Sequence, residues 1–433
     1  MKRTVNVGLI GFGTVGAGVA RLLYGKEKSF LNGRDFTLEL VKIADIDIVR
    51  DRGIAIPSGV LTADANEVLE NPSIDIVIEL VGGYEPARTF TLRAFENGKS
   101  VVTANKALIA KHGTELFTAA RAANVSYMFE ASVGGGIPLI RSITEGLNAN
   151  TIQSIFGILN GTTNYILTCM ARDGADYRDA LKKAQKLGLA EADPSSDVSG
   201  RDALNKIVIL ARLAFGAELS PENVYCEGIE QVSIREIEYA YDLGYIIKLL
   251  AIAKRHDDGR VEVRVHPALV STDSIMAYVE DEFNAVEIHG DAVGRQVFYG
   301  KGAGMMPTAS AVVSDTVDVA ERFLTGAPST VKRIAVNGDG PGLVPMEELK
   351  LRYYLCFTVK DQPGVLARIS KVLADGNISI QSVIQIGTAS EDYVPLVIMT
   401  HEAREGDMQR AMREFGRFDM VKGRVQLIRV EEI

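Results

Sequence analysis

Near its N-terminus the chain carries three glycines in the spacing Gly11-x-Gly13-x-x-Gly16. An apolar run over residues 5–10 leads into the first glycine, and a stretch with helical spacing follows over residues 14–23. Glycine permits a tight turn and a close approach of backbone N–H groups to a ligand, while the start of a helix offers positive potential. The pattern predicts a dinucleotide-binding turn, although the spacing alone also fits any tight strand–helix connection. The predicted cofactor contacts here are Gly11, Gly13, Thr14, Val15 and Gly16.

The first 130 residues continue this alternation of apolar runs and helical stretches. Such an order predicts a parallel sheet with helices on both faces, so we expect a Rossmann-type domain over residues 1–130. The expected strands cover 5–10, 38–44, 76–81, 100–103 and 125–129, and the expected helices 14–23, 86–97 and 114–123.

Beyond the glycine run at 134–136 the helical patterns become longer, as over 138–147 and 202–215, which predicts an α+β domain for substrate binding and dimerisation over 131–302. We expect the segment 303–325 to return and complete the first domain. A stretch rich in Gly and Pro predicts a linker over 326–350. The order strand, helix, strand, strand, helix, strand over 351–433 predicts a ferredoxin-like domain.

Composition excludes several classes of protein. With 47% hydrophobic and 24% charged residues the chain is typical of globular proteins, and its net charge of -9 argues against a nucleic-acid partner. No run approaches the ~18 apolar residues of a membrane span, and no signal peptide precedes the first strand, so we expect a cytoplasmic protein. The cysteines Cys169, Cys226 and Cys356 are scattered, which suits a reducing compartment and gives no metal-ligand spacing.

Two carboxylates, Asp45 and Asp47, follow the second expected strand, where the adenine ribose should lie. A carboxylate there binds both ribose hydroxyls and repels a 2′-phosphate, which favours NAD over NADP. Arg50 and Arg52 are near enough in sequence to favour NADP instead, and the two aspartates alone would also suit a turn cap.

The segment 188–206 holds the densest set of side chains suited to catalysis. Ser199 and Asp202 resemble a capping box, so a helix should begin there and present Asp202 and Lys206 on one face. A lysine beside a carboxylate can move the hydroxyl proton during hydride transfer, although such pairs are most often solvated. Glu191, just before the helix, could bind a substrate ammonium group.

Two further turns carry candidate residues. Lys106 follows an expected strand end in Thr103-Ala104-Asn105-Lys106, where ligands of parallel sheets bind, although the lysine would also suit the start of a helix. Glu130 precedes a glycine-rich turn whose carbonyls suit a hard monovalent cation, yet the residues alone indicate a structural turn.

These motifs resemble the homoserine dehydrogenase family. The resemblance covers residues 1–325 and is most specific over 191–206; it includes Asn160-Gly161-Thr162-Thr163-Asn164-Tyr165. It implies NAD(P)-dependent interconversion of L-homoserine and L-aspartate 4-semialdehyde in threonine, methionine and isoleucine biosynthesis. The resemblance implies Lys206 as proton donor or acceptor, Asp202 as its partner and Lys106 as a second substrate or cofactor contact. It implies Glu191 and Asp197 as substrate ligands, and Thr103 and Gly302 as cofactor contacts. It also implies a cation, usually sodium, bound by Glu130 and the carbonyls of Val133, Gly135 and Ile137.

The chain departs from the family in two places. Ser196 stands where an acidic residue is frequent, so Asp197 would act alone. The stretch 45–47 lacks the arginine that many NADP-using relatives carry.

The C-terminal region resembles an ACT domain, a module that binds amino acids, through Thr358-Val359-Lys360-Asp361-Gln362-Pro363-Gly364 and Asn377-Ile378. The resemblance implies threonine as effector, bound near Gly364 and Asn377. Because no aspartate kinase region precedes residue 1, we expect a monofunctional enzyme, as a homodimer or homotetramer.

Two alternatives stand beside this interpretation. A metabolite sensor without catalysis would need neither Lys206 nor Glu191. An aspartate-semialdehyde dehydrogenase would need a thiol nucleophile, for which none of the three cysteines has a convincing sequence context.

Overall fold

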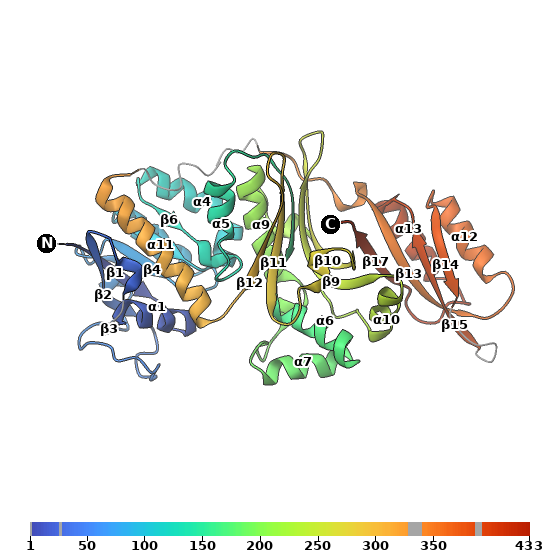
Figure 1. Ribbon diagram of the computed structural model, residues 1–433, viewed down its shortest axis with the longest axis horizontal. Coiled ribbons are helices and arrows are strands. Elements are labelled where there is room, and N and C mark those ends of the chain that lie inside the picture. Colours follow the sequence, from blue (N-terminus) through green and yellow to red (C-terminus); the bar gives the residue numbers. More distant parts are fainter. Residues whose placement is uncertain (1, 26–27, 328–339, 386–391) are drawn as a thin grey trace. The chain divides into compact units, whose positions relative to one another are not determined.

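The computed structural model describes residues 2–25, 28–327, 340–385 and 392–433 (Figure 1). Contacts divide the chain into two compact units, and each is described by itself. The units cut across the predicted bounds, since residues 131–302 are divided between them. The first unit is Met1–Gly161, Asp202–Val224 and Glu282–Pro341; the second is Thr162–Arg201, Tyr225–Asp281 and Gly342–Ile433.

The first unit is built on a six-stranded parallel sheet, as the alternating sequence predicts. Its central strand β1 buries Val5, Val7 and Leu9 completely, because helices cover both faces of such a sheet. The strand order is β3 (Leu61–Thr62), β2 (Phe36–Ala44), β1 (Arg3–Ile10), β4 (Ile76–Glu79), β5 (Ser100–Thr103) and β6 (Tyr127–Met128).

A long helix from the end of the predicted substrate domain lies against the first helix of this sheet (Figure 1). The two helices approach closely at Gly18, where a Cβ would stand 2.8 Å from the Cβ of Ala309. The glycine therefore allows residues 305–325 to join the sheet domain. The helices of this part are α1 (Thr14–Tyr24), α2 (Asn66–Leu69), α3 (Ala87–Glu96), α4 (Lys106–Ala122) and α11 (Met305–Thr325).

The first unit also contains three antiparallel strands, β7 (Ile152–Ile158), β11 (Phe283–Gly290) and β12 (Gly294–Lys301), and helix α9 (Arg201–Phe215). The helical stretch predicted over 138–147 is present: α5 (Leu139–Arg141) continues as a π-helical turn to Gly146. The carboxylate of Glu130 accepts the N–H groups of Ile140 and Arg141 at its start.

The second unit contains the predicted strand and helix order of a ferredoxin-like domain over its C-terminal part: β13 (Lys350–Lys360), α12 (Val365–Asp375), β14 (Ile380–Gln385), β15 (Tyr393–Thr400), α13 (Glu405–Phe415) and β17 (Gln426–Glu431), with β16 (Ala403–Arg404) paired to β13. Its other elements are α6 (Gly161–Asp173), α7 (Tyr177–Lys186), α8 (Ser195–Val198), β8 (Tyr225–Cys226), α10 (Ile234–Asp242), β9 (Tyr245–Arg255) and β10 (Val261–Ser271).

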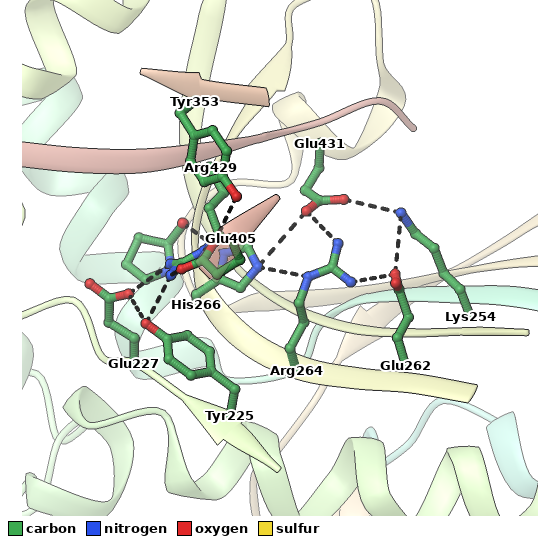
Figure 2. Close-up of polar contacts among 11 residues, drawn as sticks. Tyr225, Glu227, Lys254, Glu262, Arg264, His266, Tyr353, Glu405, Arg429 and Glu431 are labelled. Atoms are coloured by element: carbon green, nitrogen blue, oxygen red, sulfur yellow. Dashed lines mark hydrogen bonds and ion pairs between the residues drawn. The ribbon is translucent and has the colours of Figure 1, made fainter. Parts of the chain in front are cut away.

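The last strand, β17, joins two parts of this unit. It pairs antiparallel with β13 on one side and parallel with β10 on the other. Figure 2 shows the ion pairs at this junction: Arg264 of β10 lies between Glu262 and Glu431, and Arg429 of β17 reaches Glu405 and Glu227. Both arginines are almost fully buried. The C-terminal strand β17 thus lies between β10 and β13 in one continuous sheet.

The predicted linker, 326–350, lies partly outside the described residues, at 328–339. Its last part is not a free connection. Val344 is buried and its N–H donates to the carbonyl of Val261 at 2.8 Å, and Leu349 is buried in the same apolar core as β13. None of the described helices is long and apolar enough to cross a membrane.

Candidate active site

The structure places Lys206 and Asp202 together inside the first unit. The Lys206 Nζ donates to Asp202 Oδ2 at 2.7 Å and to the carbonyl of Leu159 at 2.6 Å. Only 9% of the lysine side chain and 8% of the aspartate side chain are exposed. The pair is therefore buried in α9, whereas an ordinary i,i+4 pair lies in solvent.

Asp202 is the centre of the cluster. Its Oδ1 lies 3.1 Å from the Nζ of Lys106, and its Oδ2 also accepts from the side-chain amide of Asn160 at 2.9 Å. Burial alone would raise the pKa of this carboxyl, but the ammonium groups of Lys206 and Lys106 outweigh burial and lower the pKa well below its usual value. An anionic Asp202 thus holds two lysines at one place.

Lys106 begins α4 at the end of β5. Asn105 caps this helix by accepting the N–H of Leu108 at 3.1 Å. The Lys106 side chain is 39% exposed, so a ligand can reach its amine. The side chain of Lys206 is only 9% exposed. The residue that starts the helix is also the one that reaches Asp202.

Thr103, the predicted cofactor contact, has a fully buried side chain. Its hydroxyl donates to Glu79 at 2.7 Å and accepts the N–H of Asn105 at 3.0 Å. Glu79 also accepts the N–H of Val81 at 2.8 Å. Burial raises the pKa of the Glu79 carboxyl, although these hydrogen bonds oppose the rise. Glu79 therefore joins the ends of β4 and β5 beneath the site.

The three glycines of the first turn differ in what they require. Gly11 has φ +97° and a Cβ there would lie 2.6 Å from the carbonyl carbon of Leu80, while a Cβ on Gly16 would lie 2.2 Å from the carbonyl oxygen of Gly11. A Cβ on Gly13 would meet no atom within 4 Å. The first and third glycines are needed for packing, and the middle one leaves an open face at the start of α1. Thr14 and Val15 form the first turn of that helix.

Asp45 ends β2 beside this turn. Its carboxylate accepts the N–H of Phe12 and that of Asp47 at 2.8 Å, and it lies 3.3 Å from Nη2 of Arg52. The Arg52 guanidinium stands 4.8 Å from the ring centre of Phe12. A carboxylate and an arginine therefore lie together where an adenine ribose would be bound.

Glu130 is buried, and each of its carboxylate oxygens accepts one backbone N–H at 2.8 Å. The following turn is left-handed at Gly134 and Gly135, with φ of +74° and +56°. The N–H of Ile137 closes this turn on the carbonyl of Gly134 at 2.9 Å, and the carbonyl of Ile137 accepts the N–H of Leu139 at 2.9 Å. A carboxylate followed by this turn fits a hard cation.

Glu191 and Asp197 lie in the second unit. Glu191 is exposed, and its carbonyl accepts from Gln185 at 3.1 Å. Asp197 Oδ2 lies 3.1 Å from the hydroxyl of Thr162, which also donates to the carbonyl of Leu189 at 2.8 Å. Glu191 thus lies in the loop before α8 and Asp197 within α8, in the segment that leads into α9.

Comparison with known protein families gives three matches along the chain. Residues 11–130 match the NAD-binding domain of homoserine dehydrogenase, residues 138–317 match homoserine dehydrogenase, and residues 353–418 match the ACT domain. The homoserine dehydrogenase of Pseudomonas aeruginosa is 42% identical over 437 residues, with 100% of both chains covered. The chain belongs to the homoserine dehydrogenase family.

Solved structures of the homoserine dehydrogenase family agree. A homoserine dehydrogenase from Thiobacillus denitrificans matches with a TM-score of 0.93 and 42% identity, covering 100% of this chain and 99% of that one. A hyperthermophilic archaeal homoserine dehydrogenase in complex with NADPH matches with a TM-score of 0.62 and 29% identity, covering 74% of this chain and 98% of that one. The family makes the chain an oxidoreductase with an NAD-binding, a catalytic and an ACT domain.

The alternative with a thiol nucleophile is not supported. Cys169 and Cys356 are buried, and Cys226 is partly buried. Burial raises the pKa of the Cys226 and Cys356 thiols to about 11, and it also raises the pKa of Cys169. The thiols are therefore protonated at neutral pH, which a nucleophile of this kind cannot be.

One local prediction in the site segment was wrong. Ser199 does not cap α9, since it ends the short helix α8 and its buried hydroxyl has no partner among the described residues. Gly200, with φ +82°, makes the reversal into α9 instead. A left-handed glycine replaces the side-chain cap that the sequence pattern suggested.

Sequence reasoning missed Asn160 and Glu79. Asn160 lies in the quoted motif 160–165, but nothing in its local pattern shows that it reaches Asp202, which is 42 positions away. Glu79 had a detectable signal: a carboxylate that ends an otherwise apolar strand, Ile76–Glu79, in a sheet whose strand ends carry the site.

Proposed function

We propose that the protein is a homoserine dehydrogenase that interconverts L-homoserine and L-aspartate 4-semialdehyde with NAD or NADP. The observation that carries the proposal is the buried Lys206–Asp202–Lys106 cluster at the strand ends of a dinucleotide-binding unit. When bound, the nicotinamide accepts or returns a hydride at the carbinol carbon of the substrate.

Lys206 is the residue that moves the proton. In the oxidising direction its neutral amine takes the hydroxyl proton as the hydride leaves the carbon; in the reducing direction its ammonium returns a proton to the forming alkoxide. An ammonium group has three N–H donors. Two of them are used by Asp202 and by the carbonyl of Leu159, so the third is left for the substrate oxygen.

Three further residues have substrate roles in this proposal: Lys106 of the first unit, and Glu191 and Asp197 by the family resemblance. The ammonium of Lys106, held by Asp202, is placed to bind the substrate carboxylate or the reacting oxygen. Glu191 would bind the substrate ammonium group, and Asp197 would act alone beside Ser196. The family resemblance supports these roles, because the spacing from Glu191 to Lys206 is that of the family.

The cofactor preference proposed here is NAD, with NADP as a weaker alternative. Asp45 is rigidly held at the ribose position, which favours a free 2′-hydroxyl. Arg52 partly neutralises it and would lessen repulsion of a 2′-phosphate. The Thr103 backbone and Gly302 would contribute to the nicotinamide side.

Two ligands beyond the substrate are proposed. A monovalent cation, sodium by the family resemblance, would be held by Glu130 and the carbonyls of Val133, Gly135 and Ile137, stabilising the turn next to Gly302. An amino-acid effector, threonine, would bind the ACT domain near Gly364 and Asn377, both of which have positive φ, +90° and +55°. Catalysis would then serve threonine, methionine and isoleucine biosynthesis in a homodimer or homotetramer.

The experiment is oxidation of L-homoserine by the wild-type protein and by Lys206→Ala, with NAD and with NADP, with and without sodium and threonine. Loss of at least ~10³-fold in kcat is expected for a well-folded Lys206→Ala, since a positioned proton-transfer group contributes about 10²–10⁴-fold. Lys111→Ala serves as the matched control, because Lys111 is an exposed lysine of the same unit that pairs with Glu222 at 3.3 Å and lies over the ring of Tyr84. Equal activity of the two variants contradicts the role of Lys206, and no turnover by the wild type contradicts the function itself.

A further inference from the structure

The segment that leads into helix α9 is held by a second stretch of chain, residues 225–229. The carbonyl of Val198 accepts the N–H of Ile229 at 2.9 Å, and the carbonyl of Ser199 accepts from the thiol of Cys226 at 3.3 Å. Both carbonyls lie at the C-terminal end of α8. The stretch 225–229 therefore binds the chain at the point where α8 ends and α9 is about to begin.

Two glycines make this contact close. A Cβ on Gly228 would lie 2.0 Å from the carbonyl oxygen of Val198 and 2.6 Å from the Cα of Ser199, so only glycine fits there. A Cβ on Gly200, which makes the left-handed turn into α9, would lie 3.1 Å from the Sγ of Cys226. The two stretches touch through backbone atoms, so a shift of one displaces the other.

The stretch 225–229 is in turn bound by the last strand of the chain (Figure 2). Arg429 of β17 donates from Nη1 to Glu227 at 2.9 Å and from Nη2 to the hydroxyl of Tyr225 at 3.0 Å. That hydroxyl donates to the Glu227 carboxylate at 2.8 Å, and the guanidinium stands 4.8 Å from the centre of the tyrosine ring. Glu405 accepts from the Nε of the same arginine at 3.0 Å. Arg429 thus ties residues 225–229 to the C-terminal domain.

The backbone support of this stretch is short by comparison. Strand β8 has two residues, and its pairing with β10 is followed by one more bond, from the N–H of Glu227 to the carbonyl of Val265 at 2.8 Å. Strands usually have three to ten residues, so a strand of this length fixes little by itself. The side chains of Tyr225 and Glu227 on Arg429 therefore carry a share of what holds the stretch.

We propose that Arg429, acting through Glu227, is a positioning residue for the substrate site: the C-terminal domain holds residues 225–229, and these hold α8 and the turn into α9. This proposal rests on the proposed function, in which Glu191 and Asp197, in and before α8, bind the substrate. A binding group loses much of its effect when it is displaced by about 1 Å. The C-terminal domain is therefore part of the support of the substrate site.

The test separates substrate binding from cofactor binding. Glu227→Ala breaks the link, and the KM for homoserine should rise about tenfold, roughly the loss of one hydrogen bond to the substrate. Displacing groups that bind the unreacting end of a substrate acts on KM, so kcat should change by less than about threefold. The Kd of NADH, from its nicotinamide fluorescence, should stay within about twofold, because residues 11–16 are unaltered.

Further variants exclude a general loss of stability. Glu227 is 30% exposed, so its removal should be tolerated, and the Tm of every variant is measured. Glu227→Gln keeps an oxygen that accepts from Arg429, and it should restore the KM to within about threefold of the wild type. Tyr225→Phe removes only the hydroxyl between the two charged groups and should raise the KM about threefold.

Glu348→Ala is the matched control. Its carboxylate lies 3.0 Å from Nη1 of Arg260, an arginine–carboxylate pair of similar length just before β13, and its loss should leave the KM unchanged. The proposal is overturned if the KM of Glu227→Ala equals that of this control, even with a lowered Tm. It is also overturned if Glu227→Gln fails to restore the KM, since charge and not position would then act. A wild type that does not turn over homoserine would instead overturn the proposed function.

Discussion

Replacement of Arg429 by Met tests whether the buried ion pairs of this residue stabilise the C-terminal strand, β17. The side chain is 1% exposed; its Nε donates to Glu405 at 3.0 Å, its Nη1 to Glu227 at 2.9 Å, and its Nη2 to the hydroxyl of Tyr225 at 3.0 Å (Figure 2). Methionine keeps most of the apolar stem but no charge. Glu405, itself 2% exposed, then keeps only neutral donors, among them the Tyr353 hydroxyl at 2.9 Å.

The expected loss of stability is large. Removing one partner of a buried ion pair costs about 3–5 kcal/mol, because the remaining charge stays buried. For a domain of roughly 150–250 residues, 1 kcal/mol corresponds to ~2–4 °C, so the transition that contains the second unit should fall by about 6–20 °C. Thermal and urea unfolding followed by circular dichroism measure this change.

Two further variants make the result specific. Glu405→Gln combined with Arg429→Met leaves no fully buried charge without its partner, since the other carboxylate that loses Arg429, Glu227, is 30% exposed. The double variant should therefore be less destabilised than the sum of the single ones. Glu432→Gln is the matched control, since Glu432 pairs with Arg352 at 2.6 Å but its side chain is 77% exposed, and it should cost less than ~1 kcal/mol. An Arg429→Met protein as stable as this control, or strict additivity in the double variant, would refute the reasoning.

The pH dependence has a defined sign. Burial opposes ionisation of Glu405, but Arg429 outweighs it and lowers the pKa of the carboxyl in the folded protein. A lowered pKa contributes stability above the unfolded value near pH ~4.3, and that contribution is lost as the pH falls through the folded pKa. The difference between wild type and Arg429→Met should therefore shrink in acid.

Three other changes have expected outcomes. Asp202→Asn removes the charge between two lysines, so kcat/KM for homoserine should fall by about 10–150-fold in steady-state assays. This fall corresponds to the ~1.5–3 kcal/mol of a charge-assisted hydrogen bond. An unchanged kcat/KM contradicts the electrostatic role of Asp202. Burial raises the pKa of Asp315 to about 7, above its unfolded value, so the free energy of unfolding should decline as the pH rises toward 7. Asp315→Asn should flatten that decline when unfolding is measured at several pH values. An unaltered pH dependence in the variant would exclude Asp315 as the source of the decline. Arg52→Ala should lower the affinity for NADPH by at least threefold more than for NADH in fluorescence titrations, because only NADPH carries the 2′-phosphate; equal changes would show that Arg52 does not distinguish them.

Local patterns predicted the fold well where the cause is local. The glycine turn, the alternating strands and the spacing of Asp202 and Lys206 all depend on neighbours within a few residues, and the structure has each of them. The class of the C-terminal domain follows from the order of its elements for the same reason. The capping pattern at Ser199 failed because a left-handed glycine, Gly200, makes the turn into α9 instead.

Long-range pairing accounts for what the sequence could not show. That Lys106 and Asp202 meet and that Asn160 reaches the same carboxylate depend on contacts between distant segments. The pairing of β17 with β10 is of the same kind, because neither strand carries a local mark of its parallel partner. Composition gives the class of protein and leaves these contacts open.

The shared strand β17 also fixes an order of events during synthesis. Arg264 and Glu431 are 167 positions apart, so at ribosomal rates of about 5–20 residues per second the arginine emerges roughly 8–33 s before its partner carboxylate. For that interval the edge of β10 that later binds β17 is open. An open edge accepts any extended segment, including one from a neighbouring nascent chain. The residues of β17, which are synthesised long after those of β10, are therefore the ones that close this edge against misassembly.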